Sequence, residues 1–168
     1  NILIIFRCNA DPIVGFGHLT RCLALAEVLD SYGVGCIMVG PSKKYYQDNK
    51  MLVFSNWIEK VVWTSSAEDS EDFVKIAKKY SSHMAVIDDY RVDEKYQEVL
   101  KKSGLHWLQF DNGKLNTILA DLVLNTNPMV SSYHYKEKLK NPVSKLLLGP
   151  KYAVLRSGFP PKNKISSE

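Results

Sequence analysis

The sequence has little of what marks secreted or membrane proteins. Only three cysteines occur in 168 residues, Cys8, Cys22 and Cys36, and none of them forms a CxxC pair. Their odd number and apolar surroundings predict buried free thiols in a reducing compartment rather than a disulfide framework. No apolar run reaches the ~18 residues that a membrane-spanning helix needs, and residues 2–6 are too short for the core of a signal peptide. These absences predict a cytoplasmic protein without a membrane span.

The sequence also lacks a large excess of positive or negative charge. The chain carries 22 Lys and Arg against 18 Asp and Glu, which gives a formal net charge of +4 spread along its length. A nucleic-acid-binding face needs a clustered basic surface, so we expect no nucleic-acid partner. The 45% hydrophobic and 24% charged residues are instead the mixture found in one globular domain with an ordinary core.

Short apolar strands alternate with helical patterns along the chain. Residues 2–6 form an unbroken apolar run that is typical of a buried parallel strand. Apolar residues at i, i+3, i+4 and i+7 predict a helix over residues 18–29, which Gly33 ends. The same signals predict further strands at residues 34–39, 61–63, 84–87, 105–110, 122–124 and 146–148. Further helices are predicted at residues 42–51, 68–80 and 93–102.

This alternation predicts an α/β fold, a Rossmann-like open parallel sheet with helices on both faces. Four of its strands are expected to be parallel neighbours, at residues 2–6, 34–39, 84–87 and 105–110. We assign residues 1–156 to this domain. Residues 157–168 are rich in Pro, Lys and Ser, and we expect them to be a tail or the start of a linker.

The loop after the first strand contains two glycines, Gly15 and Gly17, before a helix whose backbone amides could meet an anion. It is not a dinucleotide-binding fingerprint, because Thr20 occupies the third glycine position and no acid follows the second strand. The sequence also has no GxxxxGK[ST] phosphate-binding loop. No set of His, Cys or acidic residues has metal-ligand spacing. We therefore predict neither a cofactor nor a metal.

His18 lies in the first turn of the predicted helix, where the helix dipole disfavours the protonated imidazole and leaves a neutral ring that can act as a base. The alternative is that His18 only caps the helix or bonds a neighbouring loop. Asp88, Asp89 and Tyr90 follow a predicted strand directly, at the edge of the sheet where ligands bind in such folds. Their carboxylates could orient a base, bind a sugar hydroxyl or hold a metal. The alternative is that Asp88 or Asp89 caps the next helix.

Four stretches of the chain carry motifs that occur together in one enzyme family. They are residues 7–26, with the run Gly15-Phe16-Gly17-His18-Leu19-Thr20-Arg21-Cys22, and residues 86–90, 122–125 and 147–156. In this order they resemble the UDP-2,4-diacetamido-2,4,6-trideoxy-β-L-altropyranose hydrolases of pseudaminic acid biosynthesis. The resemblance spans nearly the whole chain, and its glycine-histidine-arginine-cysteine run is specific.

The resemblance implies the N-terminal half of a GT-B-like fold and an enzyme that releases UDP from a UDP-linked diacetamido-trideoxy sugar. In that reaction water attacks the anomeric carbon, and His18 is the implied catalytic base. The implied substrate-binding residues are Gly15, Phe16, Gly17, Arg21, Asp89 and Tyr90. Arg21 has a structural alternative, which is an ion pair with Asp88 or Asp89. A C-terminal nucleotide-binding domain is the implied partner that holds most of the UDP, so we expect the isolated chain to be inactive or weakly active.

Two other functions stay open at this point. The chain could be the acceptor-side domain of a GT-B glycosyltransferase, since only the acceptor differs from water. It could also be a non-catalytic sugar-binding module, because Asn9 and Asn112 stand where the resembled family usually has acids. His18 together with Tyr90 favours hydrolysis over the module. Nothing in these residues separates hydrolysis from transfer.

Overall fold

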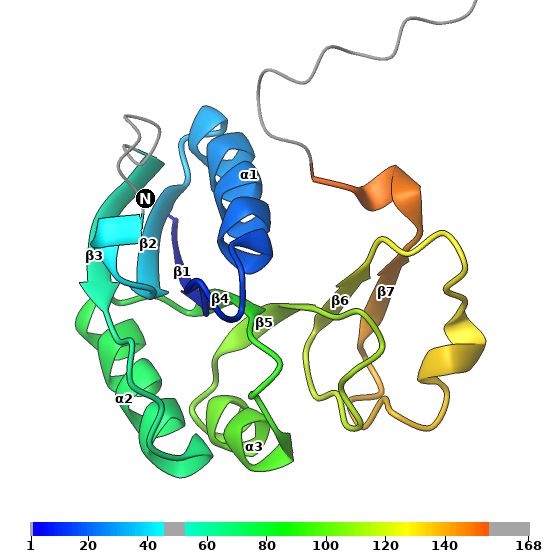
Figure 1. Cartoon of the computed structure of the whole chain (residues 1–168). Coiled ribbons are helices and arrows are strands. Elements are labelled where there is room, and N and C mark those ends of the chain that lie inside the picture. Colours follow the sequence, from blue (N-terminus) through cyan, green and yellow to red (C-terminus); the bar gives the residue numbers. More distant parts are fainter. Residues whose placement is uncertain (1, 46–52, 155–168) are drawn as a thin grey trace, which may run out of the picture.

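The computed structural model describes residues 2–45 and 53–154, which form an open sheet with helices on both faces (Figure 1). The seven strands are all parallel, in the order β3-β2-β1-β4-β5-β6-β7. In chain order they are β1 (Leu3–Cys8), β2 (Gly35–Gly40), β3 (Phe54–Glu59), β4 (Met84–Asp88), β5 (His106–Phe110), β6 (Leu122–Asn125) and β7 (Lys145–Leu148). The helices are α1 (Gly17–Ser31), α2 (Ser66–Lys79) and α3 (Glu94–Lys102), with 3₁₀ turns η1 (Lys43–Tyr45), η3 (Ser132–Tyr135) and η4 (Pro150–Tyr152).

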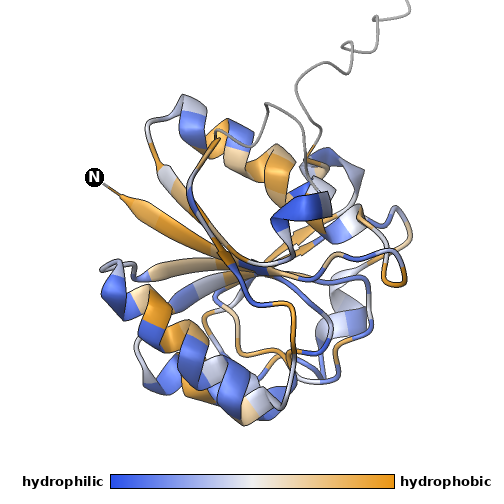
Figure 2. Cartoon of the chain, turned by 60° about the vertical axis from the view of Figure 1, so that its left-hand side comes forward, coloured by the Kyte–Doolittle hydropathy of each residue, from blue (hydrophilic) through white to orange (hydrophobic). Residues whose placement is uncertain are grey.

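The core has two layers, one on each face of the sheet. Helix α1 packs against one face, and α2 and α3 pack against the other (Figure 1). Successive strand residues point to opposite faces, so Phe6 joins the α1 layer with Leu23 while Ile5 joins the other layer with Phe73. Figure 2 shows the first strand, β1, as hydrophobic and much of the surface of α2 and α3 as hydrophilic.

Most of the predicted elements are confirmed. Strands β2, β1, β4 and β5 are parallel neighbours in the central sheet, as their apolar runs predicted. Helix α1 extends to Ser31, and Gly33 then adopts a positive φ of 75°, which lets its amide donate to the carbonyl of Asp30. The three cysteines are free and buried, as predicted. None of the described helices is long and apolar enough to cross a membrane.

The predicted strand at residues 61–63 is wrong. The third strand of the chain is β3, which precedes that segment and contributes Phe54 and Trp57 to the α1 layer. The Phe54 ring meets Phe6 edge-on, with the centroids 5.4 Å apart. Val62 is 72% exposed, so its β-branched side chain has nothing to pack against. Burial of aromatic surface therefore decides the strand position over local β propensity.

Two predictions fall partly or wholly outside the described residues. The predicted helix over 42–51 is described only as far as the 3₁₀ turn η1, and residues 46–52 lie outside the described part. The predicted tail, 157–168, lies outside it too. The capping interpretation of Asp88 and Asp89 is wrong, because Asp93 caps α3 by accepting a 2.9 Å hydrogen bond from the amide of Tyr96.

The end of β2 packs very closely against the end of β1. Gly40 has a φ of 138°, and a Cβ at this position would lie 2.1 Å from the carbonyl oxygen of Cys8 and 2.5 Å from Nη1 of Arg7. Only glycine permits this approach. The contact holds the carboxyl ends of both strands together beside the loop that leads into α1.

Candidate active site

The strand order reverses beside β1. From β1 the chain adds β2 and β3 on one side and then returns to add β4 on the other. Open parallel sheets bind ligands in the crevice at such a switch point, outside the carboxyl ends of the strands. The register pairs Cys8 with Asp88, so the loop after β1 and the segment after β4 lie side by side. This edge holds the glycine loop, the start of α1, Asp88 and Tyr90.

His18 faces both Asp88 and Tyr90. Its Nδ1 lies 3.9 Å from Oδ1 of Asp88, and its ring meets the Tyr90 ring edge-on with the centroids 4.8 Å apart. The side chain is 15% exposed, yet Nδ1 is buried and has no hydrogen-bond partner among the described residues. The exposed part of the imidazole therefore belongs to its other atoms. Phe16 occupies the N-cap position of α1 without a side-chain cap, so the alternative that His18 caps the helix is wrong.

Arg21 lies about one turn along α1 from His18 and ties the helix to β4. Its Nε and Nη2 each donate a 2.8 Å hydrogen bond to the carboxylate of Asp88, which is fully buried. Nη2 also donates to the hydroxyl of Tyr90 over 3.2 Å. Burial works to lower the pKa of Arg21, but the hydrogen bonds and charge of Asp88 outweigh it and raise that pKa. The guanidinium therefore stays charged at neutral pH.

Tyr90 completes the cluster with a neutral hydroxyl. Burial raises the pKa of Tyr90, and the neighbouring charge of Arg21 opposes that shift only in part. Because the hydroxyl oxygen accepts a hydrogen bond from Arg21, its own proton is available to another acceptor. The edge of the sheet thus combines an imidazole and a phenol donor, held in place by the ion pair between Arg21 and the buried carboxylate of Asp88.

The glycine loop forms the rim next to His18. The amides of Ile13 and Val14 donate to the carboxylate of Asp11, at 2.8 and 2.7 Å, and the Gly15 amide donates to the Asp11 carbonyl. Gly15 has a φ of 87°, and neither Gly15 nor Gly17 has any other atom within 4 Å of where a Cβ would stand. Open space therefore lies over this stretch of backbone.

Of the remaining predicted residues, one lies on the rim and one does not. Phe16 is exposed on the rim, and its ring lies 5.7 Å from that of Tyr45. Asp89 is buried, and its carboxylate is held by Arg91 through hydrogen bonds of 2.9 and 2.7 Å. The Arg91 guanidinium in turn lies 4.3 Å from the ring centroid of Trp63. The structure brings Asp88, rather than Asp89, to His18, Arg21 and Tyr90.

Sequence reasoning missed a buried ion pair on the other face of the sheet. Arg7 donates from Nε and Nη2 to Asp69 of α2, at 3.0 and 2.9 Å, and both side chains are buried. Tyr96 of α3 donates its hydroxyl proton to the same carboxylate over 2.9 Å. The one available signal was an arginine at the end of an otherwise apolar strand, because a charge in such a place needs a partner.

The side chains of the described residues do not form a metal site. Among residues 2–45 and 53–154, no three His, Cys, Asp or Glu side chains form a group that could hold a metal ion.

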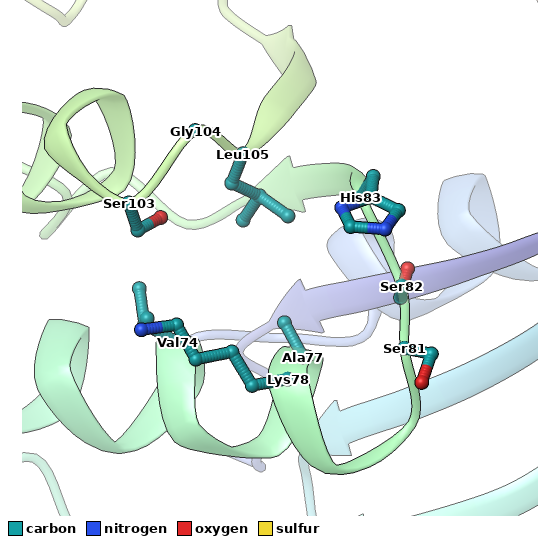
Figure 3. A pocket seen from close by; sticks show the side chains of 9 residues that line it. All are labelled: Val74, Ala77, Lys78, Ser81, Ser82, His83, Ser103, Gly104 and Leu105. Carbon is teal, nitrogen blue, oxygen red and sulfur yellow. The ribbon is translucent and has the colours of Figure 1, made fainter.

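A cavity of about 220 Å³ lies at the opposite, amino edge of the sheet, between the end of α2 and the turn before β5 (Figure 3). Lys78, His83 and Leu105 are among the residues that line it, and it is separate from the His18 cluster.

A parallel sheet with a polar cluster at its switch point defines a Rossmann-like α/β domain, and solved structures confirm this class. MurG from Acinetobacter baumannii is similar with a TM-score of 0.52 at 11% identity, over 78% of this chain and 43% of that chain. A glycosyltransferase from Rickettsia africae is similar with a TM-score of 0.59 at 13% identity, over 88% of this chain and 42% of that chain. At these identities the similarity concerns the fold alone.

Sequence relatives support the family resemblance. The chain is 24% identical, over 98% of its length, to the UDP-2,4-diacetamido-2,4,6-trideoxy-beta-L-altropyranose hydrolase of Campylobacter jejuni, and covers 56% of that protein. It is 26% identical, over 87% of its length, to an uncharacterized protein of Methanocaldococcus jannaschii, of which it covers 29%. The chain thus spans about half or less of the length of these curated relatives. No family model matches it.

Proposed function

We propose that this chain is the base-bearing domain of a two-domain nucleotide-sugar hydrolase, which releases UDP from a UDP-linked diacetamido-trideoxy sugar. The observation that carries the proposal is the placement of His18 between Tyr90 and the buried carboxylate of Asp88, at the switch point of the sheet. The substrate class comes from the Campylobacter relative, which is named for its hydrolysis of such a sugar nucleotide.

The proposed reaction is attack of water on the anomeric carbon. Nε2 of His18 takes a proton from the water as the water oxygen bonds to the sugar. The bond between the anomeric carbon and the phosphate oxygen breaks, and UDP leaves with the bonding electrons. The transition state has oxocarbenium character and gains from a base on the face opposite the leaving group. The His18 proton then passes to solvent.

Asp88 and Arg21 act on His18 and Tyr90 in different ways. Asp88 faces Nδ1 of His18 and favours the tautomer that carries the proton there, which leaves Nε2 free as the base. Arg21 neutralises most of the charge of Asp88 and holds the Tyr90 oxygen as an acceptor. Tyr90 can then donate its proton to a sugar oxygen. We propose that Gly15, Phe16 and Gly17 line the same sugar site through their open rim, while Asp89 acts indirectly through Arg91.

A second domain is part of the proposal. General base catalysis contributes only ~10²- to 10⁴-fold, and most of the remaining acceleration must come from holding the sugar and diphosphate in position. The chain spans 56% of the Campylobacter hydrolase. We propose that a C-terminal nucleotide-binding domain supplies the other wall of the cleft and most of the contacts to UDP.

The test is to incubate the full-length protein with the UDP-linked diacetamido-trideoxy altropyranose in ¹⁸O-labelled water and without any acceptor. We expect UDP release, and we expect the released UDP to carry no ¹⁸O, because the water oxygen goes to the sugar. Label in the diphosphate would mean attack at phosphorus and would contradict the mechanism. Release that depends on an added acceptor would assign the chain to a glycosyltransferase instead.

A further inference from the structure

A second polar cavity opens at the same carboxyl edge of the sheet, beyond Tyr90. It has a volume of about 170 Å³ and lies between the loop after β5 and the segment after β6. The residues that matter for its chemistry are Asn112, Gly113, Asn127, Val130, Tyr135 and Lys138. None of its lining residues, all of which belong to the described part of the chain, is acidic.

Buried hydrogen bonds connect the side chains at the floor of this cavity. The hydroxyl of Tyr135 donates to Oδ2 of Asp111 and accepts from Nδ2 of Asn125, both over 2.8 Å, and all three side chains are buried. At the rim, Nζ of Lys138 donates to the carbonyl of Gly113 over 2.8 Å. These bonds join both walls, so the cavity is formed before any ligand arrives.

The hydrogen bonds also fix which way the cavity's amides point. Oδ1 of Asn127 accepts a 2.9 Å bond from the amide of Met129, which makes this atom the oxygen and leaves the NH₂ group as a donor. That NH₂ group, the side chain of Asn112 and the backbone amide of Gly113 have no protein acceptor among the described residues. The free polar groups are therefore mainly N–H donors, and they lie beside the apolar side chains of Met129 and Val130.

N–H donors next to an apolar patch fit an acetyl group, whose carbonyl oxygen accepts hydrogen bonds and whose methyl group is apolar. We propose that this cavity binds an acetamido substituent of the sugar: its carbonyl accepts from Asn127 and the loop at Gly113, and its methyl packs on Val130. The inference rests on the proposed function for the identity of the sugar. The ammonium of Lys138 keeps further N–H donors besides the one that bonds the Gly113 carbonyl, so a carboxylate is the competing ligand, and titration with acetate distinguishes the two.

The loop that lines the cavity also reaches Tyr90 of the His18 cluster. Lys114, the neighbour of Gly113 in the loop, places its Nζ 5.2 Å from the ring centroid of Tyr90. The ring of Tyr90 contacts that of His18. The cavity therefore lies at the same edge of the sheet as His18 and Tyr90, next to a loop that contacts Tyr90. In this proposal a pyranose held at His18 and Tyr90 places a ring substituent in the cavity.

The experiment measures sugar binding without UDP or turnover. The ¹⁵N-labelled 168-residue chain is titrated with N-acetyl-D-glucosamine, D-glucose and sodium acetate, and amide shifts are followed by NMR. We expect N-acetyl-D-glucosamine to shift the backbone amides of Asn112 to Lys114 and the Asn127 side-chain NH₂ group, with a dissociation constant in the millimolar range. Equal shifts with glucose, or stronger shifts with acetate, would overturn the proposal.

Variants at the cavity make the test specific. Asn127→Asp keeps the oxygen that accepts from Met129 but replaces the donor, so it should weaken N-acetyl-D-glucosamine binding about fivefold or more. Asn112→Asp should do the same and serves if the first variant fails to fold. Asn116→Asp makes the same change at an exposed position outside the cavity and should bind normally. Unchanged binding in both cavity variants would refute the inference.

The two proposals can fail separately. If the full-length protein releases no UDP but the chain binds the N-acetyl sugar at this cavity, the proposed hydrolysis is wrong and the acetamido site stands. If UDP is released but no acetamido-dependent shift occurs near Gly113, only the acetamido site is wrong.

Discussion

The guanidinium of Arg21 and the carboxylate of Asp88 form a two-point ion pair, with distances of 2.8 Å from Nε to Oδ2 and from Nη2 to Oδ1. The pair joins the first turns of α1 to the end of β4, across 67 positions of sequence. It is the structural alternative for Arg21 that the sequence left open. Because Asp88 also faces Nδ1 of His18, the same carboxylate serves both the fold and the proposed base.

Replacing the proposed base should separate chemistry from binding. In the full-length protein, His18→Asn should lower turnover by about 10²- to 10⁴-fold and leave KM nearly unchanged, because a general base acts in the transition state. UDP release under steady-state conditions measures both constants. His83→Asn, at the opposite edge of the sheet, is the matched control and should keep wild-type turnover. Near-normal turnover of a folded His18→Asn protein would remove His18 from the mechanism.

The coupling between Arg21 and Asp88 can be measured with a double-mutant cycle. Arg21→Met and Asp88→Asn should each destabilise the chain, and the double variant should lose less than the sum. We expect a coupling free energy of about 1–2 kcal/mol, below that of a fully buried pair because 37% of the Arg21 side chain is exposed to solvent screening. Urea unfolding of the four proteins gives the value. Additive losses would show that the pair does not stabilise the fold.

The buried pair on the other face should be worth more. Arg7→Met leaves the carboxylate of Asp69 buried without its main partner, and this should cost about 3–5 kcal/mol in the free energy of unfolding. Lys60, whose Nζ is 3.7 Å from Asp69, offsets only part of the loss. Lys75→Met removes an exposed ion pair with Asp72 and should have no measurable effect. Equal behaviour of the two variants in urea unfolding would contradict this ranking.

Two glycine substitutions should differ in their effect on stability. Gly40→Ala forces a Cβ into the carbonyl of Cys8 at a positive φ, and should destabilise the chain by about 2 kcal/mol or more. Gly17→Ala meets open space within a helical turn and should be tolerated. If the proposed sugar site is correct, Gly17→Ala should raise KM in the full-length protein while thermal stability is kept. Normal stability of Gly40→Ala would show that β1 and β2 can move apart.

The buried tyrosines should make the fold sensitive to alkali. Burial, followed by the charge of Asp69, raises the pKa of Tyr96 well above its ordinary value. A group whose pKa is higher in the folded state binds its proton more tightly there, so its contribution is complete below about pH 10 and is lost as the pH rises through the folded pKa. Tyr96→Phe should therefore flatten the fall of the unfolding free energy above pH 10. The same slope in both proteins would contradict the assignment.

The sequence by itself was sufficient to predict the strands and helices that are specified by patterns among neighbouring residues. The apolar run at the start of the chain and the i, i+3, i+4 spacing after His18 predicted β1 and α1, because burial on a sheet imposes those periods directly on neighbouring residues. The two loop glycines and the polar residues after the strands then located the candidate site at the carboxyl edge.

Only the tertiary structure decided which side chains meet. Asp88 and Asp89 are adjacent in sequence, but successive residues at a strand end point to opposite faces, so Asp88 reaches His18 while Asp89 reaches Arg91. The position of β3 likewise depended on the space that Phe54 and Trp57 fill beneath α1. Contacts such as Arg7 with Asp69 join residues 62 positions apart, and no local pattern records them. Strand register and packing set these pairs, because they depend on how distant segments share one core.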